Sequence, residues 1–377
     1  MAPIDVIEVT MFKVRKDLVH EFETSSHRKG SIEHVLLKAT TADGRVGWGE
    51  AASPADPYYC YEYTGGCWDA LGRYLVPALL ERPFETPAEA RAASHVTGHP
   101  FAHAATDMVA WDLFAQVEDA PLADVLGGTQ REVSAGVSLG IERTIDDLLE
   151  VVAHHVADGY RRVKLKINPA WAHEPARAVR EAFPDLMVQV DANGAFGLGD
   201  VDGPVFARLD ELGLLMIEQP FAADDLLAHA ALQRRIATPV CLDESVTSPA
   251  MLDVALALDA ARVINIKVSR LGGLGPAREV HDRCRDAGVP VWCGGMHEFG
   301  VGRAANLAVA SLPGFSLPSD LSGSSKYYES DVVDPPIVAI DGMVRVPRER
   351  AGLGLAVLEE LVRAEAVDAV TLRADGV

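Results

Sequence analysis

Cysteine is scarce in this chain of 377 residues, and it is not arranged in pairs. The five cysteines are odd in number and form no Cys-x-x-Cys motif, which excludes a disulfide framework and a thiolate zinc site. A reducing compartment suits this cysteine content. No run of 18 uncharged apolar residues occurs, and charges interrupt the first 26 residues. We therefore expect neither a membrane-spanning helix nor a signal peptide, and we predict a cytoplasmic protein.

Basic residues are also few compared with acidic ones. The chain has 34 Lys and Arg residues against 55 Asp and Glu residues, which gives a formal net charge of −21, and it contains no long run of basic residues. A nucleic acid or an anionic membrane surface would repel such a protein. We therefore expect no nucleic-acid or membrane partner, and we expect a small molecule as the substrate.

The first 130 residues combine strands with helices. Alternating or β-branched residues predict strands at residues 4–16 and 34–41, followed by a turn and a third strand at 46–50. Apolar residues at intervals of three and four then predict helices at 68–80 and 101–117. This order is typical of an α+β domain.

From residue 133 onward, short apolar strands alternate with amphipathic helices. We predict eight strands, at residues 133–139, 162–167, 187–192, 214–219, 240–244, 263–268, 290–294 and 315–317. Helical stretches between them include residues 145–157, 175–182, 226–236 and 277–287. Eight strands favour a parallel barrel over an open sheet, which usually has about six strands.

The predicted fold class is thus α/β, a modified TIM-like (β/α) barrel with an α+β capping domain. We assign residues 1–130 to the capping domain and 131–320 to the barrel, and we expect 321–377 to return to the capping domain. Within that return, the run at 337–346 is predicted to form strands that join the first domain.

Charged residues end five consecutive strands of the predicted barrel, where buried strands should be apolar. Counted from the second lysine, they recur at intervals of one βα unit: Lys164 and Lys166, then Asp191, Glu218, Asp243 and Lys267. The carboxyl ends of barrel strands meet at one mouth, so we expect these side chains to converge. Lys164 and Lys166 are two residues apart and therefore face the same side of their strand.

Three carboxylates in one mouth would repel one another unless a cation lay between them. Mg²⁺ is the ion that best suits oxygen ligands, and Mn²⁺ is a possible substitute. Strands two and six stand half a circumference apart, so Lys166 and Lys267 would face each other across the substrate. A lysine can then abstract a proton α to a carboxylate if nearby cations lower its pKa. The alternative is that the lysines are only counterions of the acidic cluster.

These strand ends resemble those of the enolase superfamily, in its muconate-lactonizing branch. The resemblance covers nearly the whole chain and rests on Lys164-Leu-Lys166, Asp191-Ala-Asn193, Glu218-Gln-Pro220, Asp243-Glu-Ser245 and Asn265-Ile-Lys267. Longer stretches at 159–167, 293–296, 300–306 and 310–318 are similar to the N-succinylamino acid racemase and o-succinylbenzoate synthase family. The resemblance implies Mg²⁺-dependent proton abstraction through an enediolate, a chemistry in which this superfamily uses a Lys or His base.

Carried over to this sequence, the resemblance makes Lys164, Lys166 and Lys267 catalytic and Asp191, Glu218 and Asp243 metal ligands. It also implies a set of substrate contacts: Phe22, Tyr59, Ser138, Asn193, Arg270, Gly295, Met296 and His297. Loops at 22–26 and 57–63 of the first domain would cover the barrel mouth. The four tyrosines of 57–63 could equally form an oligomer contact, and we expect a homo-oligomer.

Three residues bear on the activity within the family. Arg270 occupies a position where racemases of the family tend to carry arginine, although it could equally be a surface residue that pairs with an acid. His297 and Phe299 depart from the family pattern and could change the pocket. The leading prediction is an N-succinylamino acid racemase. The alternatives are o-succinylbenzoate synthase, which performs a syn-dehydration, and a metal-binding barrel without catalytic activity.

Overall fold

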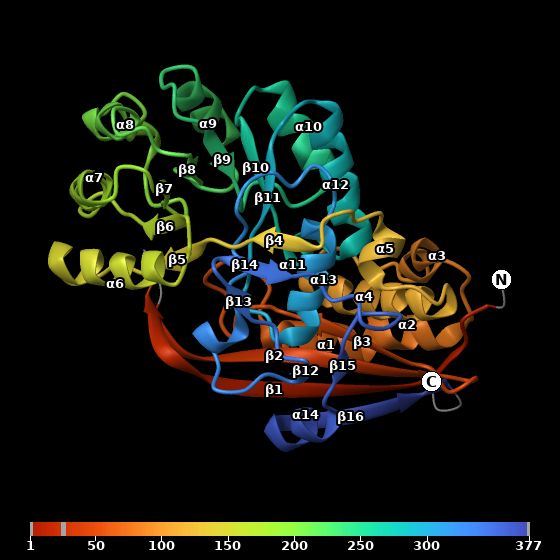
Figure 1. The fold of residues 1–377 in the computed structure, drawn as a ribbon. Helices are drawn as coiled ribbons and strands as arrows, with labels where there is room; N and C mark the ends of the chain where they lie inside the picture. Colours follow the sequence, from red (N-terminus) through yellow and green to blue (C-terminus); the bar gives the residue numbers. More distant parts are fainter. Residues whose placement is uncertain (1–2, 24–27, 375–377) are drawn as a thin grey trace.

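A four-stranded antiparallel sheet forms the base of the molecule (Figure 1). The computed structural model describes residues 3–23 and 28–374. The strands run in the order β16-β1-β2-β3, with bounds β1 (Val6–Glu23), β2 (Arg28–Thr41), β3 (Val46–Ala51) and β16 (Ala366–Arg373). Alternate residues of β1 and β2 are buried on opposite faces of this sheet, so both faces are covered. The predicted meander is confirmed.

Helices cover one face of this sheet. They are α1 (Thr64–Ala70), the π-helix η1 (Leu71–Leu75), α2 (Val76–Glu81) and α4 (Pro100–Val117). Two further helices, α3 (Pro87–Ala92) and α5 (Leu122–Leu126), pack on α4. Helix α4 packs closely on β3 because that strand carries glycine at the contact. A Cβ atom at Gly49 would lie 2.0 Å from the carbonyl oxygen of Ala105.

A parallel sheet of seven strands forms the second part of the fold, in the order β11-β10-β9-β8-β7-β6-β5. Its strands are β5 (Val137–Leu139), β6 (Arg162–Lys166), β7 (Met187–Asp191), β8 (Ile217–Glu218), β9 (Val240–Leu242), β10 (Val263–Ile266) and β11 (Val291–Cys293). The predicted α/β class, with a parallel sheet and an N-terminal capping domain, is confirmed.

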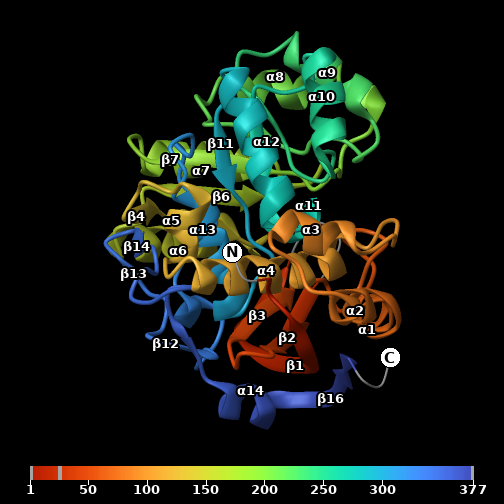
Figure 2. The same cartoon turned by 90° about the vertical axis from the view of Figure 1, so that its right-hand side faces the viewer.

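Helices separate consecutive strands of this sheet, and several of them line its outer side (Figures 1 and 2). They are α6 (Ile145–Ala157), α7 (His173–Ala182), α8 (Pro204–Asp210), α9 (Leu226–Gln233), α10 (Pro249–Ala257), α11 (Val268–Leu271), α12 (Leu274–Asp286) and α13 (Gly300–Ala310). Strand β10 is shorter than predicted because a helical turn, α11, begins at Val268.

The predicted strand at 133–139 is wrong as a single strand. Residues Glu132–Ser134 form β4, which pairs with β14 (Met343–Arg345) in a separate small sheet, and β14 also pairs with β13 (Ala339–Ile340). Gly136 separates β4 from β5, and a Cβ atom at this residue would lie 2.2 Å from the guanidinium of Arg162. The prediction for 337–346 is therefore also wrong, because these strands join β4 and the return to the first sheet is made by β16.

The predicted eighth barrel strand is not a strand in the structure. Single parallel bridges join Phe315 to Val291 on one side and Ser319 to Ala135 on the other. Pro313 lies two residues before the predicted strand, and Pro318 follows it directly. Because proline has no N–H to donate to a neighbouring strand, the pairing is limited to isolated bridges. The remaining short elements are η2 (Leu198–Asp200), η3 (Ser324–Lys326), β12 (Val333–Asp334), β15 (Ala356–Val357) and α14 (Glu359–Glu365).

Two buried carboxylates fasten the first domain to helices that follow strands of the parallel sheet. Glu50 of β3 accepts hydrogen bonds from the backbone N–H groups of Phe299 and Gly302, where α13 begins. Asp107 of α4 accepts one from Leu274, the first residue of α12. Carboxylates at helix N-termini satisfy otherwise unpaired N–H groups, so these contacts fix the first domain beside the ends of the parallel strands. Within residues 3–23 and 28–374, no helix is long and apolar enough to cross a membrane.

Candidate active site

The strand register brings the predicted charged residues to one edge of the parallel sheet. Lys166 is the register partner of Asp191, and Asp191 is the partner of Glu218. Asp243 directly follows β9, and Lys267 directly follows β10. Neighbouring parallel strands end at a common edge, so all five side chains start from the same level.

Lys164 lies at the centre of an acidic cluster. Its ammonium is 3.4 Å from Asp191, 3.1 Å from Glu218 and 2.6 Å from Asp320. Glu218 is also held from both sides by amide groups, since Gln189 and Asn265 each donate a hydrogen bond of 2.8 Å to it. Glu218 is therefore fixed in position by residues of β7 and β10.

The other two lysines each contact one carboxylate of the cluster. The Nζ atom of Lys166 donates hydrogen bonds of 2.6 Å to Asp191 and to the side-chain oxygen of Asn193. The Nζ atom of Lys267 is 2.8 Å from Asp243. Both lysines are buried, and so are the two carboxylates. The predicted convergence of lysines and acids is thus present in the structure.

The expected lowering of lysine pKa values is wrong for Lys164 and Lys267. Burial opposes the charged form of Lys164, but Asp320, Glu218 and Asp191 outweigh it and raise its pKa. Burial likewise opposes the charged form of Lys267, and Asp243 reverses that effect, so its pKa lies well above its usual range. The prediction counted the neighbouring cations and left out the closer carboxylates.

The acidic cluster disfavours the charged form of Glu218. Burial and the negative charges of Asp191 and Asp243 together raise the pKa of Glu218 to about 8. In the described part of the chain, no three His, Cys, Asp or Glu side chains already surround a point where a metal ion could bind. The donors are nonetheless three carboxylates, the ligands that Mg²⁺ prefers, and a divalent cation would relieve their repulsion. The residues therefore fit such an ion, provided that the ammonium groups give way.

A cavity of about 220 Å³ opens beside this cluster. Lys166 and Lys267, on strands four positions apart in the sheet, both line it. Three non-glycine residues just beyond strands at this site, Asn193, Gln219 and His297, have positive φ angles of 46°, 39° and 65°. Such strained backbone tends to occur at functional sites.

Five of the eight predicted substrate contacts line this cavity: Tyr59, Asn193, Gly295, Met296 and His297. The hydroxyl of Tyr59 donates to Asp243 at 3.0 Å and accepts from Lys267 at 3.4 Å. Burial lowers the pKa of His297 well below its usual range, so its imidazole is neutral, and it stacks on Tyr327.

The tyrosines of the predicted covering loop lie in two environments. Tyr58 and Tyr59 line the cavity, whereas Tyr61 and Tyr63 are exposed. Phe299 does not line the cavity. It is fully buried against His34 and Tyr328, so its departure from the family pattern concerns packing.

Ser138 and Arg270, two of the three remaining predicted contacts, do not line the cavity. The hydroxyl of Ser138 donates to Asp320 at 2.8 Å. Arg270 is buried, contrary to the alternative that it is a surface residue, and its guanidinium pairs with Asp243 and donates to the carbonyl of Val246. The side chain of Phe22 and the loop at 24–27 lie outside the described residues.

Sequence reasoning missed several residues of the site. Asp320, which pairs with Lys164 and Arg162, stands just after the predicted eighth strand, and a charge at that strand end was the available signal. Glu244 lines the cavity and accepts a hydrogen bond of 2.8 Å from Asn193. Lys29 of β2 also lines the cavity, but its strand gives no pattern that distinguishes it from a surface lysine.

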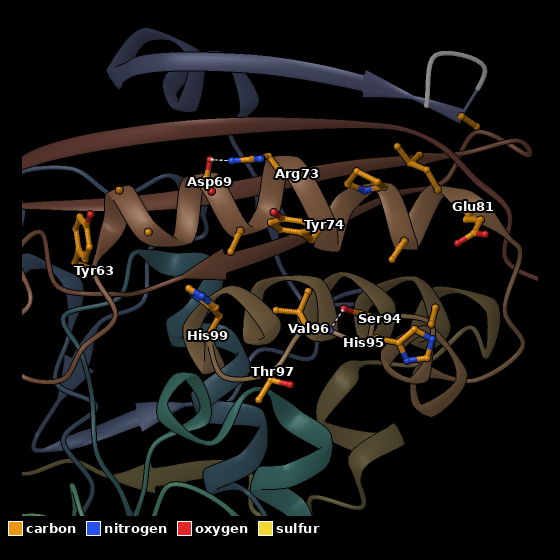
Figure 3. A pocket seen from close by; sticks show the side chains of 18 of the residues that line it. Tyr63, Asp69, Arg73, Tyr74, Glu81, Ser94, His95, Val96, Thr97 and His99 are labelled. Carbon is orange, nitrogen blue, oxygen red and sulfur yellow. Dashed lines mark hydrogen bonds and ion pairs between the residues drawn. The ribbon is translucent and has the colours of Figure 1, made fainter.

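A much larger hollow lies elsewhere, on the first domain (Figure 3). It measures about 1210 Å³ and runs between the helices η1 and α2 and the segment that precedes α4. Tyr74, Arg73 and His95 are among the residues on its walls. None of the strand-end lysines or carboxylates lines it, so its size does not make it the candidate active site.

Two protein-family models match this chain. Residues 6–127 match the family described as "Mandelate racemase / muconate lactonizing enzyme, N-terminal domain". Residues 147–361 match the family described as "Enolase C-terminal domain-like". Together the two matches cover most of the chain.

Individual relatives are similar over almost their whole length. An o-succinylbenzoate synthase of Geobacillus kaustophilus is 44% identical over 91% of this chain and 92% of its own. An N-succinylamino acid racemase of an Amycolatopsis species is 45% identical over 94% of this chain and 95% of its own. The solved structure of an enolase superfamily member from Listeria innocua is 32% identical, with a TM-score of 0.94 over 98% of this chain and 100% of that one.

Proposed function

The chain belongs to the mandelate racemase and muconate lactonizing enzyme family of the enolase superfamily, and from this premise we propose that it is an N-succinylamino acid racemase. The substrate class is a small carboxylate that bears a proton on its α-carbon. The reaction removes that proton to form an enediolate and returns a proton to the other face.

The observation that carries this proposal is the placement of two lysines. Lys166 ends β6 and Lys267 follows β10, four strands away in the same sheet, and both line one cavity of about 220 Å³. A substrate carbon in that cavity would have an amine on each side. Two opposed groups that can accept and donate a proton are what a racemase needs.

Each residue of the site has a proposed role. In one direction Lys166, in its neutral form, accepts the α-proton, and Lys267, in its charged form, donates a proton to the opposite face; in the other direction the roles exchange. Asn193 positions the amine of Lys166, and Tyr59 positions that of Lys267. Lys164 provides fixed positive charge beside the substrate carboxylate.

Asp191, Glu218 and Asp243 would hold Mg²⁺, with Mn²⁺ as a possible substitute. When bound, the ion would supply the positive charge that stabilises the enediolate. Gln189 and Asn265 orient Glu218 for this task through their hydrogen bonds, whether or not the ion is present.

A second candidate function is o-succinylbenzoate synthase, because relatives with that name are 44% and 43% identical to this chain. The same residues can perform this dehydration. Lys166 would accept the α-proton and return it to the departing hydroxyl, whereas Lys267 would only stabilise charge.

Other sequence predictions stay proposals. We propose that residues 315–319 complete the barrel between β11 and β5. The proposed domain units are residues 1–130, 131–320 and 321–377. We also propose that the protein is a cytoplasmic homo-oligomer.

The experiment that tests the proposed function compares an N-succinylamino acid with the precursor of o-succinylbenzoate, both in the presence of Mg²⁺. We expect an N-succinyl-L-amino acid to lose its optical rotation and, in deuterated water, to gain deuterium at the α-carbon. Removal of divalent ions with EDTA should stop both changes, and added Mg²⁺ should restore them. The unsaturated product of dehydration is followed by its absorbance in a parallel assay. Full activity without any divalent ion, or no exchange with either substrate, would refute the proposal.

A further inference from the structure

The cavity contains one more lysine than the proposed reaction uses. Lys29 of β2 comes from the first domain and lines the cavity together with Lys166 and Lys267. The other two lysines each contact a carboxylate of the acidic cluster, at 2.6 Å and 2.8 Å. Lys29 lies outside that cluster, so its charge has no part in holding the carboxylates.

The charges around Lys29 show how close the three cations are. Burial, with the positive charges of Lys166 and Lys267, lowers the pKa of Lys29 to about 7, and the negative charge of Glu298 opposes this shift. Three ammonium groups on one small cavity repel one another, and an anion bound among them would remove that repulsion. Among the described residues that line the cavity, these three lysines stand against one acidic residue, Glu244, so the cavity is better suited to an anionic ligand than to a neutral one.

The substrates of both candidate functions supply two anionic groups. An N-succinylamino acid has one carboxylate on the reacting carbon and a second at the end of the succinyl chain, and a succinylbenzoate precursor likewise has two. Lys166 and Lys267 are committed to the reacting carbon. A second carboxylate thus needs a separate cation on the wall of the cavity.

We propose that Lys29 binds this second carboxylate and thereby determines the specificity of the enzyme for dicarboxylate substrates over N-acyl amino acids with an uncharged acyl group. The proposal rests on the proposed function and extends it. Other cations near the site are less suited, since Lys164 lies among Asp191, Glu218 and Asp320, and Arg270 is buried against Asp243. Neither of them lines the cavity.

The test compares one substrate that has the second carboxylate with one that lacks it. In Lys29→Met, the KM for an N-succinylamino acid should rise by about tenfold to a hundredfold, the range for loss of a hydrogen bond between charged groups. The KM for the N-acetyl derivative of the same amino acid should change by less than about twofold. Lys29→Arg keeps the charge and should recover most of the preference. Lys38→Met is the matched control, because Lys38 lies on the same strand, contacts Glu359 and does not line the cavity.

Equilibrium binding separates this proposal from the proposed function. N-succinylglycine and N-acetylglycine differ in the second carboxylate, and their affinities can be measured by calorimetry with Mg²⁺ present. The wild-type protein should prefer N-succinylglycine, and Lys29→Met should lose that preference even if no racemisation is found with any substrate. Equal affinities in the wild-type protein would overturn the role of Lys29. An equal fall in kcat for both substrates would also overturn it, because that result would assign Lys29 to proton transfer.

Discussion

Removal of either opposed lysine should stop racemisation while leaving half of the exchange reaction intact. In Lys166→Met, the remaining Lys267 should still exchange the α-proton of one enantiomer with solvent deuterium. In Lys267→Met, the remaining Lys166 should exchange the α-proton of the opposite enantiomer. The reason is that each amine reaches only one face of the carbon held between them.

The structure sets the expected size of both effects. Loss of a positioned base should lower turnover by about a hundredfold to ten-thousandfold. Leaving a buried charge fully unpaired costs about 3–5 kcal/mol of stability. Each variant should lose less than this, because the carboxylate that contacted the removed lysine keeps a second partner. Asp191 keeps Lys164 at 3.4 Å, and Asp243 keeps Arg270. We therefore expect each variant to lose about 1–3 kcal/mol and to stay folded.

The assay is proton NMR of each pure enantiomer in deuterated water with Mg²⁺, with urea unfolding as the check on folding. Dehydration would give a different pattern, since only Lys166→Met should abolish it while Lys267→Met keeps a residual rate. If both variants exchange both enantiomers, or if both lose stability with no change in turnover, the lysines are only counterions of the acidic cluster and the two-base reasoning is refuted.

Two further predictions concern the stability of the first domain. Burial raises the pKa of Asp112, which accepts a hydrogen bond of 2.8 Å from the backbone of Trp48, from 3.8 to about 6. The folded protein holds this proton more tightly than the unfolded chain does. The free energy of unfolding should therefore fall by about 3 kcal/mol as pH rises from about 4 to about 6. Asp112→Asn should lack this decline when urea unfolding is measured across the same pH range, and a decline as steep as that of the wild-type protein would contradict the prediction. Gly49→Ala should lose about 3 kcal/mol because its Cβ would lie 2.0 Å from the Ala105 carbonyl oxygen. Gly199→Ala, with no atom within 4 Å, should change thermal stability little, and equal losses in both variants would argue against the close approach of α4 to β3.

The sequence alone determined the family, the alternation of strands and helices, and the level at which the charged residues lie. The intervals from Lys166 to Lys267 match the length of one βα unit, and period and length are properties of the chain itself. The parity of Lys164 and Lys166 put both on one side of β6, and the structure shows both beside Asp191. Such inferences hold because neighbours along a strand or between adjacent strands follow from the backbone repeat.

Only the tertiary structure decided which charge stands next to which. The sequence predicted lowered lysine pKa values from the tandem pair, but Asp320, from the far end of the sheet, approaches Lys164 to 2.6 Å and raises its pKa. Arg270 was left open between a substrate contact and a surface residue, and the fold buried it against Asp243. Lys29 reaches the cavity from the first domain, a placement that depends on how Glu50 and Asp107 fasten that domain to helices that follow strands of the parallel sheet. Electrostatic effects depend on distances of a few ångströms between segments far apart in the chain, and those distances are set by packing.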